Sequence, residues 1–150
     1  MGYIEEIREK VGEMPIILNS AGVIITDARG RVLLCYRMDT KDWGLPGGYM
    51  ELGETFKETA MRELQEEMSI TIKNLTLFDV FSGSEFYHEY PNGDKVYSVI
   101  VIYLASEYGG KITADNKEIN EVSFFNLKLL PEVTTTTKNV LEAYKNSITT

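Results

Sequence analysis

Three glutamates, Glu63, Glu66 and Glu67, are spaced so that they would share one face of a helix. Side chains three and four residues apart lie beside one another on a helix, which would hold three carboxylates close together. Like charges at this spacing destabilise a helix by about 0.2–0.5 kcal/mol per pair, and the nearby Arg62 cannot balance them alone. A divalent ion such as Mg²⁺, which binds carboxylate and phosphate oxygens, would balance them. The alternative is a solvated acidic face, as on most glutamate-rich surface helices.

The helix that would carry these glutamates has a defined start and an apolar side. Thr55 and Glu58 have the spacing of a capping box, in which hydroxyl and carboxylate satisfy free backbone donors at a helix start. Apolar residues then recur at four-residue intervals and form a buried stripe: Phe56, Ala60, Leu64 and Met68. The sequence therefore predicts an amphipathic helix that begins at Thr55, with the carboxylates on the flank of its stripe.

The segment before this helix, Trp43 to Gly48, contains two adjacent glycines. Glycine lets the backbone turn sharply and lets a carbonyl or amide approach an ion or phosphate closely. A lone Gly-Gly pair is often a plain tight turn. At this distance from the glutamate helix, the pair is better interpreted as part of the same site.

Residues 48–70, GYMELGETFKETAMRELQEEMSI, resemble the Nudix box, the signature of the Nudix hydrolase superfamily. The matching positions are Gly48, Glu54, Arg62, Glu63, Leu64, Glu66, Glu67 and Ile70. Ser69 stands where the family usually has glycine. A left-handed residue at a helix end favours glycine, so serine should cost ~1 kcal/mol there. We expect a slightly different helix exit at Ser69 and intact chemistry.

The resemblance implies an α/β/α sandwich with a mixed β-sheet between helices, in a single Nudix hydrolase domain over residues 1–150. The chain of 150 residues, with 43% hydrophobic and 25% charged residues, has the size and composition of one globular domain. Only residues 43–70 match at the level of motifs. The rest of the chain is consistent with this fold without identifying it.

The resemblance also implies an activity. Nudix hydrolases cleave the diphosphate of a nucleoside diphosphate linked to another moiety, as in nucleoside triphosphates, nucleotide sugars, ADP-ribose and dinucleoside polyphosphates. Divalent ions neutralise the diphosphate, orient a water molecule and lower its pKa. By resemblance, Mg²⁺ or Mn²⁺ would be held by the Gly47 carbonyl, Glu63, Glu66 and Glu67.

Other roles in such a site are less closely defined by the resemblance. The general base is left open between Glu63, Glu67 and a loop glutamate. Arg62 and Glu54 would orient the ligand carboxylates through charge-assisted hydrogen bonds. A catalytically silent Nudix-fold nucleotide-binding or regulatory module is the alternative, disfavoured because the three box carboxylates are all present. An isomerase of isoprenyl diphosphates is disfavoured because Cys35 lies in a predicted strand far before the box.

Three residues outside the box are candidates for substrate binding: Arg37, Glu118 and Glu121. Arg37 could reach a substrate phosphate as a fixed charge or form a surface salt bridge. Glu118 and Glu121 precede Phe124-Phe125, where the family often supplies a further glutamate as base or ligand; loop solvation is the alternative. Four rings could stack on a base, although at least two are expected to pack in the core or a hairpin: Phe81, Phe86, Tyr87 and His88.

Charge and cysteine content restrict the partners and the compartment. The formal net charge of −8 argues against a nucleic acid polymer or an anionic membrane as partner and leaves a small nucleotide-type diphosphate. Cys35, the single cysteine, is expected to be a reduced core residue. The N-terminal residues do not form a signal peptide and no apolar run could span a bilayer, so we expect a cytoplasmic location.

The remaining segments alternate between strands and helices. Residues 16–26 and 32–37 are predicted strands that form a hairpin around Asp27–Gly30. A hairpin turn is predicted at 90–94, and the apolar run 96–105 is expected at the sheet centre. Further strands are predicted at 70–72, 75–81 and 121–126, and a C-terminal helix at 133–146. An amphipathic helix at about 3–13 would pack on the body or on a second subunit, and with the family resemblance it suggests a homodimer.

Overall fold

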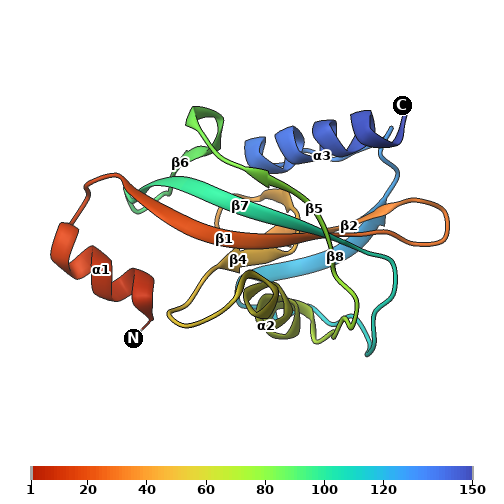
Figure 1. Ribbon diagram of the computed structural model, residues 1–150, viewed down its shortest axis with the longest axis horizontal. Coiled ribbons are helices and arrows are strands. Elements are labelled where there is room, and N and C mark those ends of the chain that lie inside the picture. The colour runs from red at the N-terminus through yellow and green to blue at the C-terminus, as the bar shows by residue number, and fades with distance from the viewer. Residues whose placement is uncertain (1, 150) are drawn as a thin grey trace.

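The computed structural model describes residues 2–149 and shows β-strands layered between helices (Figure 1). The helices are α1 (Tyr3–Val11), α2 (Phe56–Met68) and α3 (Thr135–Ile148), with a short 3₁₀ turn, η1, at Ser84–Phe86. The strands are β1 (Ile16–Ile25), β2 (Val32–Arg37), β3 (Asp42–Gly44), β4 (Gly47–Tyr49), β5 (Thr76–Phe81), β6 (Tyr87–Glu89), β7 (Lys95–Ala105) and β8 (Ile119–Phe125). Helix α2 covers one side of the strands and α3 the other, which confirms the expected α/β/α sandwich.

The strands form two sheets. The first has the order β4-β1-β7-β5, with β6 also paired to β7, and the second has the order β3-β2-β8. Strands β1 and β7 run parallel over their whole length, whereas the other pairs are antiparallel, so the first sheet is mixed as expected. Strand β7 lies inside this sheet, which confirms the central place predicted from its apolar run.

The predicted hairpin of β1 and β2 is wrong. Strand β1 is paired with β4 on one edge and β7 on the other, and β2 pairs with β3 and β8 in the second sheet. Only an isolated bridge, Thr26 to Val32, joins the two segments. Both edges of β1 are occupied, so the turn at Asp27–Gly30 leads the chain from one sheet to the other. The predicted strand at 70–72 is also reduced to one bridge, between Thr71 and Gly109.

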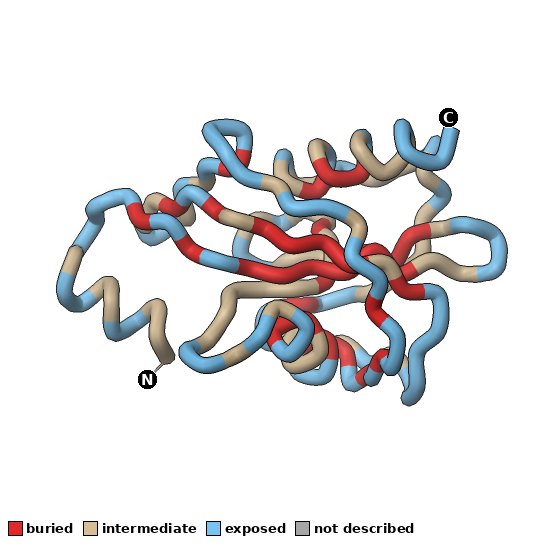
Figure 2. Tube along the Cα trace, viewed as in Figure 1, coloured by how far each residue is buried: buried red, intermediate tan, exposed pale blue. Residues whose placement is uncertain are grey.

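Two apolar cores lie on opposite sides of the strands, and the central strands are buried along most of their length (Figure 2). On one side α2 contributes Ala60, Leu64 and Met68, as its four-residue pattern predicts. On the other side α3 contributes Val140 and Leu141. This packing places the polar flank of α2 beside the strands, with Glu66 exposed and Glu67 buried.

Helix α1 and the cysteine also have defined places. The apolar side of α1, including Ile4 and Ile7, packs against a small cluster at the start of β1, so this helix rests on the body of the domain. Cys35 is 1% exposed, and burial raises the pKa of its thiol well above the usual value, as expected for an inert core residue. None of the helices in residues 2–149 is both long and apolar enough to cross a bilayer.

Candidate active site

The glutamate helix begins as the sequence predicts. The Glu58 amide donates to the Thr55 hydroxyl at 3.1 Å and the Thr55 amide donates to the Glu58 carboxylate at 2.9 Å, which completes the capping box. At the other end, Ser69 has φ 59° and ψ 35°, and its amide donates to the Gln65 carbonyl at 3.1 Å. Serine therefore adopts the left-handed conformation that glycine favours, so the helix ends as glycine would end it and the slightly different exit expected at Ser69 is wrong.

Replacement of Ser69 by glycine should stabilise the protein, because the left-handed backbone no longer carries a Cβ. We expect the free energy of unfolding to rise by about 0.5–1 kcal/mol in urea titrations. Ser106→Gly is the control, since Ser106 has an ordinary negative φ and the same substitution should not stabilise it. No gain for Ser69→Gly relative to this control would contradict the proposed helix exit.

The two glycines before the helix are required by close contacts. Gly47 has φ 146°, and a Cβ there would overlap the backbone of Ala21 and Gly22 in β1. A Cβ on Gly48 would overlap the carboxylate of Glu63. These glycines let β4 lie against β1 on one side while Glu63 packs directly on its backbone.

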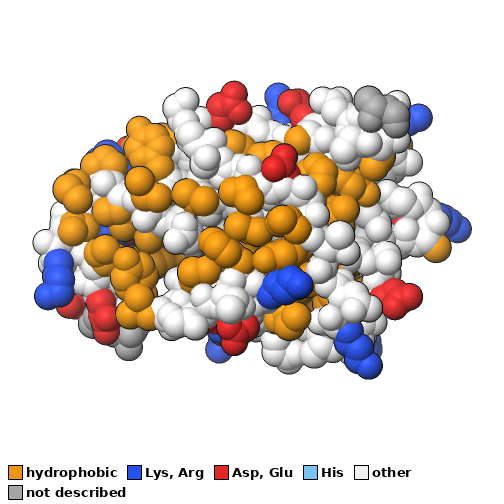
Figure 3. Space-filling model, in the orientation of Figure 1, with side chains coloured by type: hydrophobic (Ala, Val, Ile, Leu, Met, Phe, Trp, Pro, Cys, Tyr) orange, Lys and Arg blue, Asp and Glu red, His pale blue; other side chains and the backbone are white. Residues whose placement is uncertain are grey.

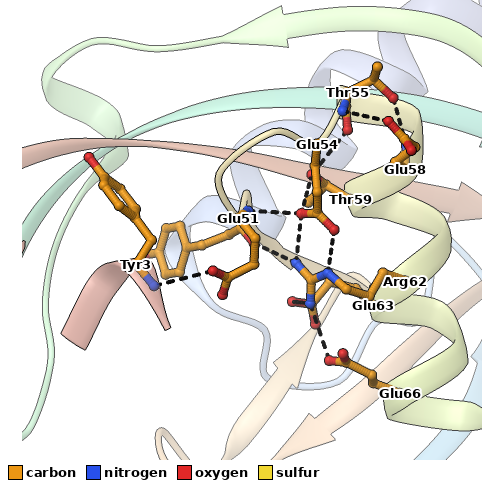
Figure 4. A network of polar contacts seen from close by, with 10 residues as sticks. Tyr3, Glu51, Glu54, Thr55, Glu58, Thr59, Arg62, Glu63 and Glu66 are labelled. Atoms are coloured by element: carbon orange, nitrogen blue, oxygen red, sulfur yellow. Dashed lines mark hydrogen bonds and ion pairs between the residues drawn. The ribbon is translucent and has the colours of Figure 1, made fainter. Parts of the chain in front are cut away.

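Arg62 holds a network of acidic side chains on the flank of α2 (Figure 4). Its guanidinium donates twice to Glu54, through Nε at 2.6 Å and Nη2 at 3.1 Å, and Nη2 also reaches the Tyr49 carbonyl at 2.9 Å. Nη1 donates to Glu63 at 3.1 Å and to Glu66 at 3.2 Å. The hydrogen bonds from Arg62 lower the pKa of Glu54 to about 2, so this pair is ionised at neutral pH. Arg62 and Glu54 thus occupy the orienting positions expected of them.

Glu63 and Glu67 form an acidic pair with little compensating charge. Glu67 is 3% exposed and accepts a hydrogen bond from the Gly47 amide at 3.0 Å. Burial, followed by the charge of Glu63, raises the pKa of Glu67 to about 8. Burial also raises the pKa of Glu63 to about 7, with Arg62 opposing the shift. Carboxyls held in this way favour either a proton or a bound cation.

The raised pKa values predict a fall in metal-free stability as pH rises. Below an unfolded-state pKa of about 4.3, Glu63 and Glu67 are protonated in both states. Between that value and their folded pKa values of about 7 and about 8, the folded state binds more protons, so stability is lost progressively. Glu54, whose pKa is about 2, has the opposite effect and stabilises the fold above about pH 4. Urea unfolding in EDTA from pH 4 to 9 should show stability decreasing from pH 5 to 8, and a flat profile would contradict this assignment.

The carboxylates line a cavity of about 720 Å³. Gly47, Glu63, Glu66 and Glu67 all contribute to its wall. The opposite part of the wall includes residues of α1, the β2–β3 turn and the β6–β7 hairpin, among them Arg8, Asp39, His88 and Tyr90. This size suits a nucleotide-sized ligand. A second cavity of about 710 Å³, lined by Thr71, Lys73 and Tyr108 among others, contains none of the predicted site residues.

Arg37 lines the same cavity and also forms an ion pair. Its guanidinium donates to Asp39 at 3.1 and 2.9 Å. Burial alone would lower the pKa of Arg37, but the hydrogen bonds and charge of Asp39 outweigh it and hold the pKa above its usual value. The salt bridge expected as one alternative is present, and it fixes a positive charge in the cavity wall, whereas contact with a substrate phosphate stays a prediction.

The structure places the two candidate glutamates, Glu118 and Glu121, differently with respect to the cavity. Glu118 lines the cavity, on the loop before β8. Glu121 lies within β8, paired with Tyr36, whereas its neighbour Val122 packs in the core beside α2. Because side chains alternate along a strand, Glu121 points to the other side of the sheet. The structure does not place Glu121 among the cavity residues, contrary to the expectation that it binds substrate.

The four candidate rings divide in a similar way. Phe81 and Phe86 pack in the core beside α3, and Tyr87 packs against Tyr97 on the sheet. Only His88 lines the cavity, with its ring edge-on to Tyr90 at a centroid distance of 4.3 Å. Tyr90, which also lines the cavity, was not predicted as a site residue, although it begins the predicted hairpin turn at 90–94.

The residues present suit a divalent cation. Within residues 2–149 no three acidic, histidine or cysteine side chains stand in a ready-made ligand arrangement, and Arg62 holds Glu63 and Glu66 by ion pairs. The donors are nevertheless hard oxygens, and Glu63 and Glu67 lack sufficient positive charge around them. Mg²⁺ and Mn²⁺ are the ions that such oxygen donors accept.

The glutamates of the capped helix α2 and the glycines of β4 thus line one cavity. The sequence model of the NUDIX domain family matches residues 17–144, so this chain belongs to the Nudix family.

The relatives differ in what they act on. The ADP-ribose pyrophosphatase of Methanocaldococcus jannaschii is 29% identical over 126 residues, which cover 82% of this chain and 69% of that protein. The NAD-capped RNA hydrolase NudC of Haemophilus influenzae is 38% identical over 87 residues, 57% of this chain but only 29% of that protein. The crystal structure of a MutT NUDIX hydrolase from Burkholderia pseudomallei superposes with a TM-score of 0.72 at 28% identity, covering 85% of this chain and 97% of that one. The chain spans only part of these curated relatives, so family membership alone does not assign their activities to it.

Proposed function

We propose that the protein hydrolyses a pyrophosphate bond in a nucleoside diphosphate linked to another moiety, with Mg²⁺ or Mn²⁺ as cofactor. The observation that carries this proposal is the single cavity wall formed by Gly47, Glu63, Glu66 and Glu67. Family membership supports the class of reaction. The names of the relatives, which include an ADP-ribose pyrophosphatase and an NAD-capped RNA hydrolase, support nucleotide diphosphates as substrates.

The roles follow from the positions of the side chains. Glu63, Glu66, Glu67 and the Gly47 carbonyl would hold the metal, which when bound neutralises the diphosphate and activates water. Arg62 orients Glu63 and Glu66 through its ion pairs while Glu54 anchors Arg62. In the wall of the same cavity, Arg37 offers a fixed positive charge to a phosphate.

Three groups could take the proton from the attacking water: Glu63, Glu67 and the loop glutamate Glu118. Glu118 lies in the cavity and is not held in the Arg62 network. Glu67 has a pKa of about 8 in the absence of metal, and a bound cation would shift it toward the ionised form. We propose Glu118 as the loop glutamate that serves as base or additional ligand.

A substrate panel tests the function. Phosphate release would be followed, with a coupling phosphatase where the product requires it, for nucleoside triphosphates, ADP-ribose, nucleotide sugars and dinucleoside polyphosphates. Each would be measured with Mg²⁺, with Mn²⁺ and with EDTA. Turnover of one group that EDTA abolishes is the expected result. If no substrate of the panel is turned over and Mg²⁺ does not shift the melting temperature, the proposal is contradicted and a binding module is favoured.

We further propose that the protein is cytoplasmic, which its reduced core thiol Cys35 supports, and that it forms a homodimer. Apolar side chains gather over one broad face of the molecule (Figure 3). Three of the exposed apolar residues lie in one row across β1, β7 and β6: Ile17, Tyr97 and Tyr87, with exposed fractions of 73%, 40% and 39%. Burial of such a row against a second copy would stabilise a dimer.

Sedimentation velocity tests the homodimer. The chain mass is 17.0 kDa, and we expect a species of twice this mass that Ile17→Asp converts to monomer. Leu129→Asp is the control, because Leu129 is 77% exposed but lies outside this row. A monomer for the unaltered protein at all concentrations would contradict the proposal.

A further inference from the structure

The loop that carries Glu118 is attached to the end of α2. Between β7 and β8 the chain runs past the C-terminal end of this helix (Figure 1). The Asp115 amide donates to the Glu67 carbonyl at 3.0 Å, and the Thr113 amide donates to the Met68 carbonyl at 3.0 Å. The backbone of Glu67 is therefore bonded directly to the loop that carries Glu118.

Within this loop, one carboxylate oxygen organises the backbone. Asp115 Oδ1 accepts the amide hydrogens of Lys117 at 3.0 Å, Glu118 at 3.2 Å and Ile119 at 3.0 Å. Asn116, between them, is in the left-handed conformation with φ 61°, and its amide donates to the Ile119 carbonyl. The result is a tight turn closed by the Asp115 side chain.

The residues on both sides of Glu118 are fixed as well. The Glu118 carbonyl accepts the amide hydrogen of Met38 at 3.0 Å, which joins the loop to the residue that follows Arg37 at the end of β2. Ile119 is 1% exposed and packs in the core with Leu64 and Met68 of α2. Glu118 is thus held by hydrogen bonds on its amide and its carbonyl while its carboxylate is left free to reach the cavity.

We propose that Asp115 is a positioning residue, which fixes the backbone of Glu118 and so sets its carboxylate opposite the glutamates of α2. Asp115 does not line the cavity among the described residues, so it acts through Glu118. The inference rests on the proposed function at one point, because an effect of Asp115 on turnover requires that Glu118 takes part in the reaction. The placement of the loop itself is a separate claim and can be tested without turnover.

Amide hydrogen exchange in the metal-free protein tests the placement. In Asp115→Ala the amides of Lys117, Glu118 and Ile119 should exchange at least tenfold faster than in the unaltered protein. Asp115→Asn should keep them protected, because its Oδ1 can still accept all three bonds. Unchanged protection in Asp115→Ala would overturn the inference whether or not the protein is an enzyme.

A double-mutant cycle tests the consequence for turnover. Asp115→Ala should lower kcat about 10- to 100-fold, Asp115→Asn should restore most of it, and in a Glu118→Gln background Asp115→Ala should cause no further loss. Equal losses in both backgrounds, or an Asp115→Asn variant as slow as Asp115→Ala, would overturn the inference.

A matched control exists in the turn between β1 and β2. Asp27 Oδ1 accepts the amide hydrogens of Arg29 and Arg31 in the same manner, and none of these three residues lines the cavity. Asp27→Ala should lower stability without changing kcat. If the unaltered protein turns over nothing in the substrate panel, the proposed function fails, and the exchange experiment still decides the role of Asp115 in placing the loop.

Discussion

Glu67→Gln is expected to lower metal-dependent turnover by at least ~100-fold while it stabilises the metal-free protein. Glu67 is almost fully buried beside Glu63, and its pKa of about 8 shows how unfavourable its charge is there. Glutamine keeps the acceptor for the Gly47 amide and removes the charge. At pH 8 the free energy of unfolding should rise by at least ~2 kcal/mol, since one pKa unit corresponds to about 1.4 kcal/mol and the pKa of Glu67 is raised from 4.5 to about 8. Loss of turnover through misfolding would not be accompanied by such a rise.

The control for this variant is Glu121→Gln. It makes the same chemical change at an exposed glutamate of β8 that points away from the cavity. Turnover and metal response should remain near those of the unaltered protein. If Glu121→Gln lowered turnover as much as Glu67→Gln does, the net charge of the protein, and not this cavity, would determine activity.

Arg62→Lys is expected to reduce kcat about 10- to 100-fold, although the positive charge is kept. Lysine cannot reproduce the fork that donates to Glu54 twice and to Glu63, Glu66 and the Tyr49 carbonyl at once. Glu54 then loses the hydrogen bonds that hold its pKa at about 2. The free energy of unfolding should fall by about 1–3 kcal/mol, as measured in urea at pH 7.

Comparison with Arg31→Lys distinguishes this network from ordinary ion pairs. Among residues 2–149, Arg31 forms an ion pair with Asp27 alone, and its replacement should change stability by less than about 1 kcal/mol and leave kcat unaltered. If Arg62→Lys behaved like Arg31→Lys, Arg62 would not be orienting the metal-binding carboxylates.

The sequence predicted the glutamate helix and its cap because both depend on local spacing. Thr55 and Glu58 satisfy each other within one turn, and the positions of Leu64 and Met68 decide which side is buried. The strand pairing was not predicted correctly, because β1 pairs with β7, which lies about 80 residues further along the chain. Apolar segments with both faces buried give no alternation from which a partner can be identified.

The choice between Glu118 and Glu121 could not be made from the sequence. It depends on where β8 begins and on the register in which Glu121 faces Tyr36, and neither has a local signal. The turn closed by Asp115 has such a signal, an aspartate followed by Asn116 and Lys117, but its attachment to Glu67 appears only in the folded chain.

The central claim is that the cavity beside α2 carries out metal-dependent pyrophosphate hydrolysis. Its most direct test is phosphate release by the unaltered protein, Glu67→Gln and Glu121→Gln, measured side by side on the best substrate of the panel with Mg²⁺ and with EDTA. We expect turnover in the unaltered protein and in Glu121→Gln that EDTA abolishes, and almost none in Glu67→Gln. Turnover that persists in EDTA, or that survives in Glu67→Gln, would contradict the account.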